Sequence, residues 1–106
     1  MKAGDSVDVA EESSLTGDNK LLLRAIDHYG AKNQASQLMG EMGELAAELT
    51  RHFFQNRNRE KEIAEEIADV QVMLEQMILH LGIEGEVSEW RPNKLKRLGS
   101  RINQAG

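Results

Sequence analysis

The sequence predicts an all-α fold: a four-helix unit built on a long antiparallel α-hairpin, which assembles into an oligomeric helical bundle. Apolar residues make up 40% of the 106-residue chain, but aromatic residues only 4%. The core must therefore be aliphatic, and this composition favours helices over sheets. Apolar residues also recur at helical spacing through two long segments. A chain this short buries only a thin core, so self-association would help to stabilise it.

Three helices are expected in the first 81 residues. A first helix spans residues 21–29 and ends at Gly30, because glycine is the common residue just past a helix end. Two long helices follow over residues 31–54 and 60–81, with the polar segment 55–59 as the turn between them. The apolar stripe of the first long helix is formed by Ala35, Leu38, Met42, Leu45, Leu49 and Phe53. That of the second is formed by Ile63, Ile67, Val70, Leu74, Met77 and Leu81.

The two ends of the chain are expected to differ. Residues 1–18 are polar and acidic, so we interpret them as a flexible tail, with Asp18 or Asn19 capping the first helix. Residues 19–106 form the single domain. Within it, residues 83–91 are interpreted as a link, and Pro92 as the first turn of a short basic helix, since proline is favoured at that position.

Composition narrows the class of function. The net charge of −5 argues against binding a nucleic-acid polymer, which requires a basic surface. No apolar run approaches the roughly 20 residues of a membrane span, so no membrane partner is expected. The chain has no cysteine, and its N-terminus is acidic without an apolar signal core. We therefore expect a cytoplasmic protein.

Two carboxylate pairs, Glu41/Glu44 and Glu66/Asp69, stand out on the long helices. Each helical residue turns by about 100°, which places both pairs about 90° to the same side of their apolar stripes. At about 1.5 Å per residue, the pairs also lie level to within roughly one helical turn. Four converging carboxylates repel one another unless a cation lies among them, and hard oxygen ligands select Mg²⁺ or Mn²⁺. The sequence therefore predicts a Mg²⁺ site.

Other residues are candidates around this site. Gln34 lies on the same edge of its helix as Glu41, and its amide could bind a base or a sugar hydroxyl. Lys94 and Arg97 in the basic C-terminal segment are candidates for contacting phosphates. Among the remaining acids, Glu48 is the best placed to join the carboxylate group.

The strings Gly43-Glu-Leu-Ala-Ala-Glu48 and Glu65-Glu-Ile-Ala-Asp-Val70 resemble those of the MazG-type, all-α nucleoside triphosphate pyrophosphohydrolases. The resemblance covers roughly residues 29–81. It implies an enzyme that uses Mg²⁺ to split a nucleoside triphosphate between its α- and β-phosphates, giving the monophosphate and pyrophosphate. It also implies a homodimer or a dimer-of-dimers tetramer. The chain departs from the family pattern at Gly40, where a further glutamate is common.

Several alternatives stay open from the sequence. Either Glu41 or Glu44 could accept the proton of the attacking water. A chain with 18 acidic residues also carries such pairs as ordinary solvated helix faces. The protein could then be a non-enzymatic helical interaction module. A related pyrophosphohydrolase acting on a phosphoribosyl nucleotide is the third interpretation.

Overall fold

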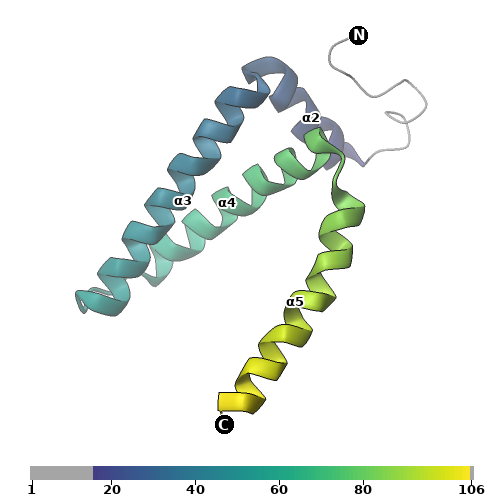
Figure 1. The fold of residues 1–106 in the computed structure, drawn as a ribbon. Coiled ribbons are helices and arrows are strands. Elements are labelled where there is room, and N and C mark those ends of the chain that lie inside the picture. The colour runs from purple at the N-terminus through teal and green to yellow at the C-terminus, as the bar shows by residue number, and fades with distance from the viewer. Residues whose placement is uncertain (1–15, 106) are drawn as a thin grey trace.

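A computed structural model describes residues 16–105, and within this range the chain forms four helices and no strand (Figure 1). The expectation of an all-helical chain is confirmed for these residues. The helices are α2 (Gly17–Tyr29), α3 (Ala31–Phe54), α4 (Glu60–Leu81) and α5 (Glu84–Ala105).

Helices α3 and α4 lie side by side and run in opposite directions on either side of a short turn, and α2 packs against both of them (Figure 1). The buried apolar side chains of the described residues are Leu22 and Ile26 on α2 and Leu38 on α3. This core is thin, as the chain length predicts. Much of the apolar stripe of α3 stays uncovered, and Phe53 is 66% exposed.

The turn between α3 and α4 is held by a buried carboxylate. Glu48 is only 7% exposed, and its two oxygens accept hydrogen bonds from Arg59 Nε at 2.6 Å and Nη2 at 3.0 Å. Arg51 Nη1 lies 3.1 Å from the same carboxylate, and the backbone N–H of Arg59 donates to His52 Nδ1 at 3.2 Å. The hydrogen bond from Arg59, followed by the charges of both arginines, lowers the pKa of Glu48 although burial opposes it.

The first helix begins earlier than expected. It starts at Gly17, and the Thr16 hydroxyl accepts a hydrogen bond from the backbone N–H of Asn19 at 3.0 Å. The expected cap at Asp18 or Asn19 is therefore wrong, because Thr16 supplies the side-chain oxygen one helical turn before the N–H group that needs it. The rest of the expected acidic tail, residues 1–15, lies outside the described residues.

The last helix also differs from the expectation. Gly82 ends α4 in a left-handed conformation with φ of 65°, but α5 then begins at Glu84 and contains Pro92 in its interior. The expected link and the helix start at proline are wrong. Acidic residues in the first turn, Glu84 and Glu86, interact favourably with the helix dipole. Pro92 removes one backbone donor without ending the helix.

Helix α5 diverges from α4 beyond this corner and leaves its side chains exposed from residue 84 to residue 104 (Figure 1). Its apolar residues share this exposure, and Trp90 is 61% exposed. Within the range from 16 to 105, no helix is both long and apolar enough to cross a membrane.

The contacts at the turn predict that Arg59→Ala lowers the melting temperature by several degrees at pH 7, because it leaves Glu48 buried without its main partner. Circular dichroism at 222 nm would measure this. Arg57→Ala, in the same turn but with an exposed side chain, is the matched control. Because the pKa of Glu48 is lowered from 4.5, the stabilisation is present above pH 4.5 and is lost as the pH falls through the folded-state pKa. Equal melting of both variants would contradict this role.

Candidate metal centre

The structure brings three of the four predicted carboxylates together. Glu41 on α3 and Glu66 and Asp69 on α4 each offer an oxygen, and these oxygens lie within 4.8 Å of one another. Glu41 and Glu66 are half-buried, and Asp69 is exposed. The opposite directions of α3 and α4 set these side chains level with each other, so residues 25 positions apart in the sequence, Glu41 and Glu66, become neighbours.

Glu44, the fourth predicted carboxylate, is exposed and does not belong to the group of converging oxygens. It lies one helical turn from Glu41, on the side nearer the α3–α4 turn. Its charge still acts on the centre, since it contributes to raising the pKa of Glu66. Glu44 therefore lies beside the candidate centre, and its carboxylate is not one of the converging groups.

Glu66 is the most perturbed of these acids. Interaction with the adjacent carboxylate of Glu41 is the main cause that raises the pKa of Glu66 to about 7, followed by burial and by the charges of Asp69 and Glu44. The Oε1 atom of Glu66 is enclosed and has no hydrogen-bond partner among the described residues. A charged carboxylate in such a place is unfavourable unless a proton or a cation neutralises it. An all-oxygen donor set with one unpartnered enclosed oxygen fits a hard divalent cation such as Mg²⁺.

Glu48 does not join the group. Arg59 and Arg51 hold its carboxylate at the α3–α4 turn, so the expectation that it is the best placed additional acid is wrong. The reason is a long-range pairing with a residue of the turn, which helical periodicity does not reveal.

The predicted substrate-binding residues fall in two different places. Gln34 is buried, and its Nε2 donates to Oε1 of Gln76 on α4 at 2.8 Å. Lys94 and Arg97 are exposed on α5, which diverges from the long helices, and Lys94 Nζ lies 5.3 Å from the centroid of the Trp90 ring. Within one chain the structure does not bring these two cations to the carboxylates.

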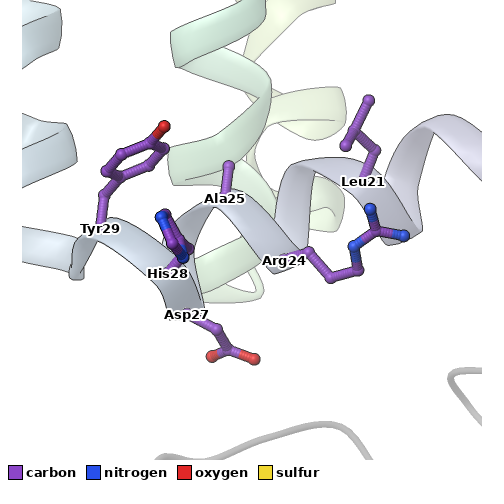
Figure 2. Close-up of a pocket in the computed structure, with 6 residues that line it drawn as sticks. All are labelled: Leu21, Arg24, Ala25, Asp27, His28 and Tyr29. Atoms are coloured by element: carbon purple, nitrogen blue, oxygen red, sulfur yellow. The ribbon is translucent and has the colours of Figure 1, made fainter.

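A shallow hollow of about 530 Å³ lies elsewhere, along α2 (Figure 2). Every residue that lines it comes from this one helix. Its charged side chains are Arg24 and Asp27, and the converging carboxylates are not part of it. The hollow is therefore separate from the candidate metal centre. The lining residues are Leu21, Arg24, Ala25, Asp27, His28 and Tyr29.

Comparison of the chain with protein-family models, with curated proteins and with solved structures gives no match. The geometry of the carboxylates therefore carries the functional argument.

The centre predicts a pH-dependent effect of Mg²⁺ on stability. Without metal, the raised pKa of Glu66, about 7 instead of 4.5, means that the folded protein keeps a proton that the unfolded chain releases. Stability therefore falls as the pH rises from 4.5 to 7. Bound Mg²⁺ would neutralise the carboxylates, so we expect it to raise the melting temperature more at pH 8 than at pH 5.

Differential scanning fluorimetry would measure both effects. Glu66→Gln should remove most of the pH-dependent response to Mg²⁺, whereas Glu65→Gln, at the exposed neighbouring position, should retain it. An identical response of the two variants to Mg²⁺ would show that Glu66 does not take part in a metal site.

Proposed function

We propose that the protein is a Mg²⁺-dependent nucleoside triphosphate pyrophosphohydrolase of the cytoplasm. It cleaves a ribo- or deoxyribonucleoside triphosphate between the α- and β-phosphates. The observation that carries this proposal is the convergence of Glu41, Glu66 and Asp69, of which Glu66 also has an enclosed, unpartnered Oε1. The resemblance of the two carboxylate strings to MazG-type enzymes supports the choice of reaction.

Glu41, Glu66 and Asp69 would hold Mg²⁺, or Mn²⁺ in its place, with Glu44 beside them. The bound ion would offset the charge of the substrate phosphates and of the transition state. The half-buried position of Glu41 and Glu66 strengthens their electrostatic interactions relative to those of exposed carboxylates.

Glu44 is the candidate general base, because it is close to the centre without belonging to the converging group. Its carboxylate would accept a proton from the attacking water. The water oxygen forms a bond to phosphorus, and the anhydride bond between the α- and β-phosphates breaks. Nucleoside monophosphate and pyrophosphate are the products, and Glu44 returns its proton to solvent.

A homodimer or a dimer-of-dimers is the second part of the proposal. Helix α5 has 22 residues and no substantial packing partner within residues 16–105, whereas most helical stability in proteins comes from packing of an amphipathic face. Its apolar residues and those left uncovered on α3 and α4 need a partner surface. A second copy of the antiparallel hairpin would supply one and complete an oligomeric helical bundle. In that assembly, Lys94 and Arg97 are the candidates for contacting substrate phosphates.

The same exposed apolar surface favours a second candidate function, that of a non-enzymatic helical interaction module. A pyrophosphohydrolase acting on a phosphoribosyl nucleotide would use the same carboxylates on a different ligand. Metal binding separates the module from both enzymes, and the substrate panel below separates the two enzymes.

An assay with nucleoside triphosphates tests the reaction directly. Purified protein with Mg²⁺ should release pyrophosphate and monophosphate from at least one member of a panel of ribo- and deoxyribonucleoside triphosphates. Glu66→Gln and Asp69→Asn should each lower kcat/KM on the order of 100-fold or more, because each removes charge that stabilises the transition state. Glu65→Gln is the matched control and should retain activity.

Two results would overturn the proposed reaction. One is release of orthophosphate from the triphosphates. The other is no turnover of any triphosphate by a protein that is folded and saturated with Mg²⁺. Turnover of phosphoribosyl nucleotides alone would favour the third interpretation.

Self-association has its own test. Sedimentation velocity should show a dimer or tetramer, and the double variant Leu98→Glu/Ile102→Glu should shift it toward the monomer, because it places charges in the apolar stripe of α5. Lys96→Glu, on the opposite side of the same exposed helix, is the matched control. A wild-type protein that is monomeric at every concentration would contradict the assembly.

A further inference from the structure

The amide pair Gln34–Gln76 is a polar contact between α3 and α4. The two side chains are 42 positions apart and are joined by one hydrogen bond of 2.8 Å. Both are buried to more than nine-tenths, with 7% of Gln34 and 5% of Gln76 exposed. Amides this deeply placed normally have most of their hydrogen-bonding groups satisfied.

Within residues 16–105, the bond between the two amides leaves some of their hydrogen-bonding groups without a partner. Each glutamine carries two N–H donors and an oxygen that can accept two hydrogen bonds, and one contact uses one of each. Gln34 Oε1 and Gln76 Nε2 have no hydrogen-bond partner among the described residues. Neither of these two atoms is fully enclosed. Among the described residues, the side-chain atom that is both enclosed and without a partner is Glu66 Oε1. An acceptor on Gln34 and a donor on Gln76, the two amides that this bond joins, therefore remain open.

The pair lies in register with the candidate metal centre. Gln34 precedes Glu41 by seven residues, and Gln76 follows Asp69 by seven residues. Seven residues are nearly two whole helical turns, so each glutamine lies on the same edge of its helix as the corresponding carboxylate, about 10 Å along the axis. That span is comparable to the reach of a nucleotide from its phosphates through its sugar to its base.

We propose that the Gln34–Gln76 pair binds the edge of the nucleotide base and so makes the centre selective for nucleoside triphosphates over base-free polyphosphates. This inference rests on the proposed function, because it places the substrate phosphates at Glu41, Glu66 and Asp69. The Watson–Crick edge of a base offers a hydrogen-bond donor next to an acceptor, which is complementary to the open acceptor and donor of the pair. Side-chain amides recognise bases in this way.

The pair can serve more than one base. If both amides rotate by half a turn, the hydrogen bond between them reverses, and the open donor and acceptor change places. Adenine and cytosine present an amino donor beside a ring acceptor, whereas uracil, thymine and guanine present a carbonyl acceptor beside a ring donor. The contact therefore separates substrates with a base from those without one, and discriminates less among the bases.

A purely structural role is the competing explanation, since a buried polar pair can fix the register of two helices. The two roles differ in what an apolar replacement does. Replacing both buried partners by apolar groups of similar size can leave stability nearly unchanged. Base recognition, in contrast, would be lost with the amides.

The test is a binding measurement on the full chain with Mg²⁺ by isothermal titration calorimetry. The probes are deoxynucleoside triphosphate analogues with an imido group between the α- and β-phosphates, which resist cleavage, and inorganic tripolyphosphate, which has no base. The wild type should bind the analogues about 10-fold or more tightly than tripolyphosphate. Gln34→Leu/Gln76→Leu should lose this preference and leave tripolyphosphate binding unchanged. The exposed pair Gln37→Leu/Gln71→Leu is the matched control and should keep it.

Gln76→Glu covers the case in which the double variant does not fold. It keeps an acceptor for Gln34 Nε2 but replaces both N–H donors of residue 76 by an acceptor oxygen, so the preference should again be lost. An unchanged preference in either folded variant, or equal binding of both probes by the wild type, would overturn the inference. Failure to hydrolyse triphosphates with the preference intact would overturn the proposed reaction and leave the base contact standing.

Discussion

The register of α3 against α4 is the constraint on which the rest of the structure depends. Two polar contacts hold it, Glu48 with Arg59 beside the turn and Gln34 with Gln76 toward the other end. The converging carboxylates lie between these contacts along the helices. A slip of one helical turn would move α4 by about 5.4 Å, which exceeds the spacing of the carboxylate oxygens. The polar contacts thus position the acids, and the thin apolar core alone would do so less specifically, because aliphatic side chains tolerate repacking.

Holding α3 and α4 in this register lowers the free energy of unfolding, and the packing of apolar side chains gives no reason for this cost. It brings Glu41, Glu66 and Asp69 together on a half-buried edge and raises the pKa of Glu66 to about 7. Like charges at such short distances oppose folding, and the small core leaves little stability to offset them. Where a protein departs from the patterns that favour local stability, the departure is commonly found at a functional site. At Glu48 the same helix edge follows those rules, since two arginines neutralise the acid. The contrast supports a cation at the unneutralised cluster.

The sequence predicts the helices and the three converging carboxylates, because both follow from the periodicity of apolar residues and the lengths of the two long helices. The other features depend on contacts between distant residues. Periodicity places Glu48 on the acidic edge but says nothing of its pairing with Arg59, and it gives Gln76 no distinction from other polar residues of α4. Pro92 illustrates a local rule that fails: proline is favoured in a first turn, but here it lies inside α5. The start of that helix is set by Gly82 and the acidic residues after it.

The structure also separates what one chain contains from what an assembly would add. The converging carboxylates and the amide pair belong to the α3–α4 register, which is internal to the chain. Lys94 and Arg97 lie on α5, which leaves that hairpin and packs against little of it. In the proposed enzyme, metal binding would need only the register, whereas charge compensation for the substrate phosphates by these two cations would need α5 to be placed by another copy. If the proposed function holds, assembly would act on phosphate binding and turnover more than on the metal site, because only the cations change their surroundings.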